Sequence, residues 1–234
     1  MSTLVTYRTE DGIATITMDD GKRNALSAQM FAELNGAFDR ALTENVPVIL
    51  TGRPETLSAG FDLKVMMAGG ADAASMVLAG FELGERLLGF PTPVVVACNG
   101  NAIAMGAFLL LSTDYRIGTA GPYRIVANEV AIGITMPHFA VEVCRHRLAP
   151  AHFGRAVINA ESYDPEQAIA AGWLDRVVPA AELQDAARAK VVELLKLNAA
   201  AHAATKRRAR ATALQAVHTA IANDRTEFKK IFGL

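Results

Sequence analysis

The sequence predicts an α/β protein in which a mostly parallel sheet is covered by helices and followed by a helical C-terminal region. Three observations support this prediction. Short apolar runs typical of strands alternate with helical patterns over roughly the first 137 residues. Ala-rich helical patterns dominate the rest of the chain. With 51% hydrophobic residues in a chain of 234, there is enough apolar material to bury a large core.

The predicted strands lie in the first part of the chain. Residues 4–8 and 13–18 alternate apolar with polar side chains around Glu10-Asp11-Gly12, which is typical of a β-hairpin. Ser27 is a good N-cap for a helix that extends to about Thr43, because its apolar residues recur at helical spacing. Further strands are predicted at 46–52, 93–98, 114–118 and 123–126, and further helices at 81–88 and roughly 104–112. The segment 64–79 contains Ala68-Gly-Gly-Ala71 and is predicted to be mobile.

Helices dominate the second part. They are predicted at 139–148, 151–158 and 165–171, the last with Asp164 as N-cap, Pro165 at its first position and Gly172 just past its end. Residues 173–178 are typical of a strand, and long Ala-rich helices run from about 180 to 232. The basic run Lys206-Arg-Arg-Ala-Arg210 is interpreted as a solvated helix face, with a local phosphate-binding cluster as the alternative.

Composition excludes several classes of protein. The 23 Lys and Arg residues are balanced by 24 Asp and Glu residues, which leaves no basic excess for a broad nucleic-acid surface. The longest strongly apolar stretch, 102–111, is too short for a membrane span, and the N-terminus lacks the pattern of a secretory signal. Two cysteines make neither a disulfide framework nor a zinc site. We therefore expect a cytoplasmic protein without a metal, and one that does not bind nucleic acid or insert into a membrane.

Two segments each combine a predicted strand, a glycine-containing turn and a predicted helix: Ser58-Ala-Gly-Phe-Asp-Leu63 and the run from Cys98-Asn-Gly100 to Phe108. The first N–H groups of a helix have no partner within the helix, and the helix dipole favours an anion there. Two such turns brought together can hold a carbonyl oxygen on which negative charge develops. Turns of this kind are common, so these residues alone favour a purely structural role over a catalytic one.

Six segments of the sequence resemble the crotonase (enoyl-CoA hydratase/isomerase) superfamily over nearly the whole chain. In order, they are Asn24-Ala-Leu26, Ser58-Ala-Gly-Phe-Asp-Leu63, Cys98-Asn-Gly100, Asp114-Tyr-Arg-Ile117, Asn128-Glu-Val-Ala-Ile-Gly133 and Ala171-Gly-Trp-Leu-Asp-Arg-Val-Val178. The resemblance implies a spiral of ββα units over 1–180 and a helical trimerisation region over 181–234, within a single domain overall. It also implies a homotrimer or a dimer of trimers, and an acyl-CoA thioester as substrate with no cofactor, because coenzyme A is part of the substrate.

The resemblance also implies a site. The backbone N–H groups of Phe61 and Met105 would form an oxyanion hole for the thioester oxygen. Residues expected to border the substrate are Lys22, Arg23, Ala25, Ala59, Gly60, Asp62, Leu63, Gly106 and Phe108. Asp62 has a structural interpretation as well, as the cap of its turn. Met105 is a departure, since the family usually has glycine there; its side chain is expected either to distort the hole or to line the acyl tunnel.

Hydratases of this family use two glutamates around a water molecule, and this sequence matches only the second of them, at Glu129. The first position holds Phe108, which cannot accept a proton or orient a water. Moving a double bond needs one base, so we expect enoyl-CoA isomerisation in fatty-acid metabolism rather than hydration. The apolar neighbours are expected to raise the pKa of Glu129.

The residues leave alternatives to this function. A weak enoyl-CoA hydratase is one, because Glu142 could stand in for the missing glutamate. A catalytically poor acyl-CoA-binding protein is another, motivated by the loss at Phe108. Glu129 itself could be a structural or surface carboxylate.

Overall fold

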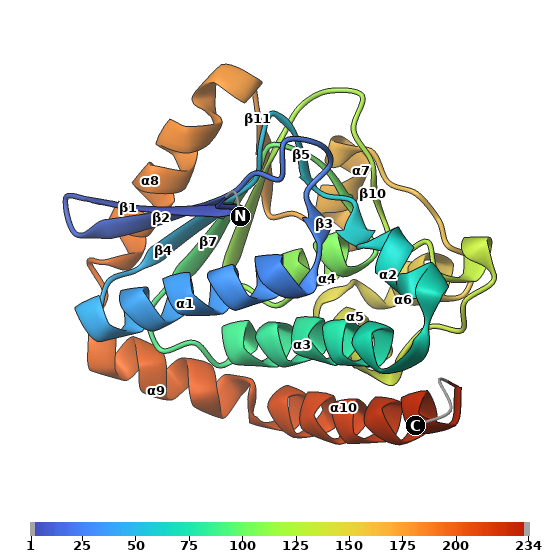
Figure 1. The fold of residues 1–234 in the computed structure, drawn as a ribbon. Coiled ribbons are helices and arrows are strands. Elements are labelled where there is room, and N and C mark those ends of the chain that lie inside the picture. Colours follow the sequence, from blue (N-terminus) through green and yellow to red (C-terminus); the bar gives the residue numbers. More distant parts are fainter. Residues whose placement is uncertain (1–2, 232–234) are drawn as a thin grey trace.

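The computed structural model describes residues 3–231, and its centre is a six-stranded sheet (Figure 1). The strand order is β1-β2-β4-β7-β9-β11, in which only the β1–β2 hairpin is antiparallel. The strands are β1 (Val5–Glu10), β2 (Ile13–Met18), β4 (Val48–Thr51), β7 (Val94–Cys98), β9 (Tyr115–Thr119) and β11 (Arg176–Val178). The predicted hairpin and parallel sheet are therefore confirmed.

Two smaller parallel sheets lie beside the large one. One has the order β10-β8-β5 and consists of β5 (Glu55–Ser58), β8 (Gly100–Ile103) and β10 (Ile125–Val126). The other pairs β3 (Ala25–Leu26) with β6 (Gly60–Phe61). The chain repeatedly places a strand in the large sheet, then one in a small sheet, then a helix, as in β7, β8 and α4. This repeat is the expected spiral of ββα units.

Helices cover the sheets and form the C-terminal region. Helix α1 (Ala28–Glu44) begins where Ser27 Oγ accepts the amide of Met30, as predicted from the N-cap. In Figure 1, α1 and α3 (Gly70–Leu88) lie next to each other, with α9 (Ala199–Ala209) and α10 (Ala211–Ile231) along the same side of the molecule. The others are α2 (Leu63–Ala68), α4 (Met105–Leu111), α5 (His138–Arg147), α6 (Pro150–Val157), α7 (Pro165–Ala171) and α8 (Leu183–Leu194), with short 3₁₀ turns η1 (Val130–Ile132) and η2 (Ala180–Glu182).

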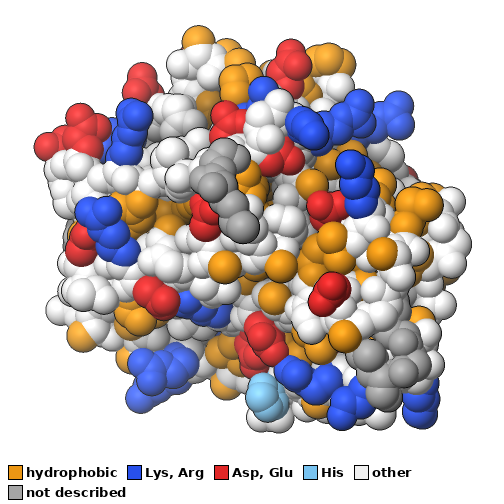
Figure 2. Space-filling model, in the orientation of Figure 1, with side chains coloured by type: hydrophobic (Ala, Val, Ile, Leu, Met, Phe, Trp, Pro, Cys, Tyr) orange, Lys and Arg blue, Asp and Glu red, His pale blue; other side chains and the backbone are white. Residues whose placement is uncertain are grey.

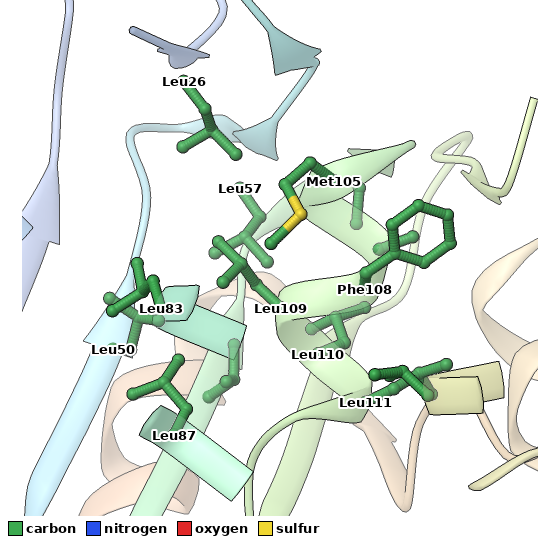
Figure 3. Close-up of a cluster of buried hydrophobic side chains, with 14 of the residues drawn as sticks. Leu26, Leu50, Leu57, Leu83, Leu87, Met105, Phe108, Leu109, Leu110 and Leu111 are labelled. Atoms are coloured by element: carbon green, nitrogen blue, oxygen red, sulfur yellow. The ribbon is translucent and has the colours of Figure 1, made fainter. Parts of the chain in front are cut away.

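The hydrophobic core lies between the large sheet and the helices, and α4 runs through it. Every residue of α4 is buried. Figure 3 shows Met105 beside Leu57 and Leu109, with the Phe108 ring further along the helix. On the surface, Figure 2 shows Lys and Arg side chains interspersed with Asp and Glu, and hydrophobic side chains between them. Among the described helices, none combines the length and the apolar character that a membrane crossing requires.

Local signals predicted several boundaries correctly. Helix α7 has the capping box formed by Asp164 and Gln167, Pro165 in its first turn, and Gly172 in the left-handed conformation after its last residue. The predicted strand at 173–178 is shorter than expected, because residues 173–174 are tied back to Ala168 O by their amides and only Arg176–Val178 pairs with β9. The predicted helix end at 232 lies outside the described residues.

The prediction that residues 64–79 are mobile needs correction. The segment is helical, in α2 and the first half of α3, and the helix predicted at 81–88 begins already at Gly70. Alanine is the strongest helix former, and one face of this Ala-rich stretch packs on the core through Ala73, Met76 and Val77. Burial of that face outweighs the Gly-Gly signal.

The interpretation of Lys206-Arg-Arg-Ala-Arg210 as a solvated face also needs correction. Lys206 and Arg210 are buried, and both pair with Asp114 at the start of β9, at 2.6 and 3.0 Å. Arg207 and Arg208 are exposed, as expected for a helix face. The interpretation of Asp114 as a structural residue agrees with these pairs.

A buried carboxylate from the C-terminal helix caps α5. Asp224 of α10 is 1% exposed, and its two oxygens accept the amides of His138 and Phe139, each at 2.8 Å. We expect Asp224→Ala to lower the free energy of unfolding by about 2 kcal/mol, since both amides then lack a buried acceptor. Urea unfolding measures this, with Asp185→Ala at an exposed position of α8 as a control that changes stability by less than about 0.5 kcal/mol.

Candidate active site

The three predicted site segments come together because the strands before them are parallel neighbours. In the sheet β10-β8-β5, the carboxyl ends of the strands lie at one edge. The chain leaves β5 into Ala59-Gly60-Phe61, β8 into Ala104-Met105, and β10 into Ala127-Asn128-Glu129. Edges of this kind are where parallel sheets bind ligands. The central position of β8 places Met105 between the other two segments.

The turn after β5 and the start of α4 are in close contact. A Cβ atom on Gly60 would lie 3.1 Å from Ile103 O and 3.7 Å from the amide nitrogen of Met105. Gly60 also has φ +89°, which favours glycine. A Cβ on Gly106 would lie 2.7 Å from Ser58 O. Both glycines are therefore required by the contact between the two turns.

The start of α4 places a backbone donor without a helical acceptor at this contact. Met105 is the first residue of α4, so its amide has no acceptor within the helix. The preceding residue, Ala104, has φ +51° and ψ −124°, which an alanine rarely adopts. Ala104 N donates to Val126 O of β10 at 2.9 Å, which fixes this turn against the strand that leads to Glu129. Backbone strain of this kind is often found at functional sites.

Polar side chains fix the position of the segment that carries the Phe61 amide. The sequence did not predict the roles of these side chains. The Asp20 carboxylate accepts the amides of Lys22, Asn24 and Ala25. Ser58 Oγ donates to Asn24 O at 2.7 Å and accepts the amide of Gly60 at 3.0 Å. Short β3–β6 pairing then sets Leu26 beside Phe61. The one available signal was the Asn24-Ala-Leu26 motif itself, in which Asn24 is fully buried.

Glu129 is a buried carboxyl group with an unpaired oxygen. Its exposed fraction is 7%, and Oε2 has no hydrogen-bond partner among the described residues. Burial raises the pKa of Glu129 from its usual 4.5 to about 7. The neighbouring Asn128 also has a buried, unpaired Oδ1. Buried polar atoms without partners are uncommon and often mark functional sites.

Two residues of the predicted site, Phe108 and Met105, have apolar side chains and supply no second group for proton transfer. Phe108 is 1% exposed and Met105 is fully buried, and both belong to the hydrophobic core. On α5, Cys144 lies near Glu129, whose charge contributes to the raised pKa of that thiol. Glu142 is two residues away on the same helix and pairs with Arg145, in a groove shared with α10. Within residues 3–231, no hydrogen bond joins Glu142 to Glu129.

The remaining predicted site residues are grouped on the β3–β6 side. Lys22 and Arg23 are exposed, and Ala25 pairs with Gly60 across the small sheet. Ala59 N donates to Arg23 O at 3.0 Å, so this loop is held to the turn after β5. Asp62 is the N-cap of α2 and accepts the amide of Lys64, as its structural interpretation predicted. Leu63 is exposed, as is Met67 on the same helix.

One group of side chains has the composition of a metal site, away from these strand ends. His138, Asp224 and Glu227 offer ligand atoms within 4.8 Å of one another. Both Asp224 oxygens already accept the first amides of α5, and His138 Nε2 is 3.1 Å from Glu227 Oε1. The contacts explain this group as a helix cap and a hydrogen bond between His138 and Glu227.

Comparisons with known proteins agree with one another. A family model described as enoyl-CoA hydratase/isomerase matches residues 8–233. A solved enoyl-CoA hydratase/isomerase family protein from Pseudomonas syringae is 48% identical, with TM-score 0.94 over 96% of this chain and 98% of that one. An apo enoyl-CoA isomerase from Mycobacterium tuberculosis is 44% identical, with TM-score 0.93 over 97% and 100%. A carnitinyl-CoA dehydratase from Salmonella enteritidis is 31% identical over 203 residues, 86% of this chain and 77% of the relative.

Proposed function

The chain belongs to the enoyl-CoA hydratase/isomerase family, and we propose that it catalyses the shift of a 3-enoyl-CoA double bond to the 2 position. The observation that carries this proposal is that Glu129 is buried and its Oε2 has no hydrogen-bond partner among the described residues, whereas position 108 holds a phenyl ring. Isomerisation needs one group that moves a proton, whereas hydration must also activate a water molecule. The similar structures from Mycobacterium tuberculosis include one described as an enoyl-CoA isomerase and one described as a probable enoyl-CoA hydratase, so the choice rests on Glu129 and Phe108.

In the proposed mechanism, the Glu129 carboxylate removes a proton from C2 of the 3-enoyl thioester. The electron pair of that C–H bond forms the C1–C2 double bond of a dienolate, which keeps its C3–C4 double bond, and the carbonyl electron pair moves onto the thioester oxygen as negative charge. The amides of Phe61 and Met105 hold that oxygen as an oxyanion hole. The Glu129 carboxylic acid then returns the proton to C4, which leaves the double bond between C2 and C3.

The buried environment of Glu129 suits both the removal of the proton from C2 and its return to C4. A carboxyl with a pKa near the working pH can take up a proton and release it with similar ease. Burial raises the pKa of Glu129 to about 7, because the charged form loses hydration. The side chains of Phe108 and Met105 are buried and apolar, so neither side chain can donate or accept a proton in this reaction.

A pH profile follows from that pKa. Glu129 must be ionised to remove the proton, so we expect kcat/KM of the free enzyme to rise with pH and level off above about 7. Initial rates with a 3-enoyl-CoA at subsaturating concentration, from pH 5 to 8.5, measure this limb. A limb centred near 4.5 would contradict it, since that value belongs to a hydrated carboxyl.

Two substrates distinguish this function from the alternatives. The purified protein is incubated with a 3-enoyl-CoA and, separately, with a 2-enoyl-CoA, and the products are followed. Rapid conversion of the first with slow hydration of the second supports the proposal. Efficient hydration would identify a hydratase, as the dehydratase relative allows. Tight binding of both thioesters without turnover would leave the acyl-CoA-binding alternative.

Further properties belong to the same proposal. We assign coenzyme A to the surface around Lys22, Arg23, Ala25, Ala59 and Leu63, because these residues border the two turns. The reaction uses no cofactor beyond the substrate's own CoA, and it serves fatty-acid metabolism in the cytoplasm. Residues 1–180 form the spiral core and 181–234 the helical region of a homotrimer or dimer of trimers. The long helices α8 to α10 offer surface for such contacts.

A further inference from the structure

The side chain of Phe61 packs in an aromatic cluster, whereas its backbone amide belongs to the candidate active site. The centroid of the Phe61 ring is 5.9 Å from that of Phe31 on α1 and 6.1 Å from that of Phe81 on α3. Phe31 and Phe81 are both buried, and Phe81 also stacks on Phe139 of α5 at 4.5 Å. The Phe61 ring therefore packs against rings whose own positions are fixed by the core.

Gly80 of α3 supplies the space that the Phe61 ring occupies. A Cβ atom at Gly80 would lie 2.7 Å from Phe61 Cε1, 2.9 Å from Phe61 Cζ and 2.9 Å from Phe31 Cζ. Non-bonded carbon atoms are normally about 3.5–4.0 Å apart. Glycine is unfavourable inside a helix, and Gly80 is buried well inside α3. The close approach of the two rings to the helix backbone requires glycine at this position.

The backbone at Phe61 is fixed from its other side as well. Gly60, directly before Phe61, approaches the start of α4, because a Cβ on Gly60 would lie 3.7 Å from the amide nitrogen of Met105. The β3–β6 pairing sets Leu26 beside Phe61. The Phe61 backbone thus lies between α4 and β3, while its ring lies against α3.

We propose that Gly80 is a positioning residue for the oxyanion hole, because the space above its Cα fixes the Phe61 ring and, through it, the Phe61 amide. A methyl group at position 80 pushes the ring away from α3. Phe31 and Phe81 block its retreat, so the Phe61 backbone moves with it. A misplacement of about 1 Å in a catalytic site can cost about a hundredfold in rate. This inference rests on the proposed function, since it takes the Phe61 amide as one of the two oxyanion donors.

Steady-state kinetics with a 3-enoyl-CoA test this role. Gly80→Ala should lower kcat about tenfold or more and change KM less than about threefold, because the amide acts on charge that develops in the transition state. A Phe61→Leu background lacks the Cε1 and Cζ atoms that meet the added methyl group. In that background the same change should lower kcat by less than about threefold.

Gly118→Ala is the matched control. It also adds a methyl group to the core, but in β9 of the large sheet, where the new Cβ would lie 2.4 Å from Leu174 Cδ1 and meets no atom of Phe61. It should leave kcat within a factor of about two. The thermal midpoint of each variant shows that the variant is folded. Should Gly80→Ala not fold, Phe61→Leu alone releases the ring and should lower kcat in the same way.

A second readout does not depend on turnover. Butanoyl-CoA labelled with ¹³C at its thioester carbonyl is saturated and cannot undergo the double-bond shift. The infrared stretching frequency of that carbonyl falls when its oxygen accepts hydrogen bonds. We expect the frequency to be lower for the bound than for the free thioester in the unmodified protein and in Gly118→Ala. In Gly80→Ala and in Phe61→Leu it should move back towards the free value.

The positioning role and the proposed function fail in different ways. If the unmodified protein does not convert a 3-enoyl-CoA, but Gly80→Ala removes the infrared shift, the proposed function is wrong and the role of Gly80 stands. The positioning role is overturned if the unmodified protein gives no infrared shift, or if Gly80→Ala keeps both kcat and that shift. It is also overturned if Gly118→Ala loses as much activity, or if the loss is equal in the Phe61→Leu background.

Discussion

We expect Glu129→Gln to lower kcat for the 3-to-2 double-bond shift by a factor of about 10²–10⁴, with little change in KM. Glutamine has nearly the same shape and polarity as a protonated glutamate, so it fits the buried position. Its amide cannot accept the C2 proton at any pH of the assay. Rates with a saturating 3-enoyl-CoA measure the loss, and the residual activity should lack the limb near pH 7.

Stability gives a second measurement on the same variant. The folded-state pKa of Glu129 lies above the usual value, so its contribution to stability is fully present below about pH 4.5 and is lost as the pH rises through about 7. Glutamine does not titrate. Relative to the unmodified protein, Glu129→Gln should therefore gain stability between pH 5 and 8, which also shows that an activity loss is not caused by unfolding.

The matched control for this experiment is Glu142→Gln. Glu142 is the other carboxylate considered for proton transfer, but it pairs with Arg145 in the groove beside α10. Its replacement should leave the isomerisation rate within a factor of about two. If Glu142→Gln abolished activity while Glu129→Gln retained it, the proposed roles of both residues would be wrong.

Local signals in the sequence predicted those elements whose ends are set locally. Helix α7 follows from Asp164, Pro165 and Gly172, each of which acts within one turn. The start of α3 at Gly70 could not be predicted in this way. It depends on burial of Ala73 and Met76 against the core, which is a tertiary effect.

The candidate site likewise combines features that the sequence predicted with features that depend on tertiary structure. Both glycine-containing turns and Glu129 were predicted from motifs and resemblance, but their meeting depends on the parallel order β10-β8-β5. The positive φ of Ala104 and the unpaired Oδ1 of Asn128 left no signal in the sequence. The basic run at 206–210 does not indicate which of its cations pairs with a buried carboxylate, because the partners are distant in sequence. Lys206 and Asp114 are 92 residues apart.

That distant pair leads to the largest expected effect on stability. We expect Asp114→Ala to lower the free energy of unfolding by about 3–5 kcal/mol, because it removes one partner from a buried ionic group. Asp114 compensates both Lys206 and Arg210, and its Oδ2 also accepts the amide of Val94 at 2.8 Å. Urea unfolding at pH 7 measures the loss, which should change little with salt because the pair is shielded from solvent.

A companion variant separates loss of the ion pair from loss of packing. In Asp114→Ala, the Lys206 ammonium keeps the carbonyls of Phe90 and Thr92 as acceptors but has no counter-charge. Adding Lys206→Met removes one stranded charge, so the double variant should be more stable than Asp114→Ala alone. If the double variant were less stable, the carbonyl contacts rather than the carboxylate would dominate at Lys206. A loss below about 1 kcal/mol in Asp114→Ala would show that water reaches both cations, and that α9 is held to β9 by its apolar contacts instead.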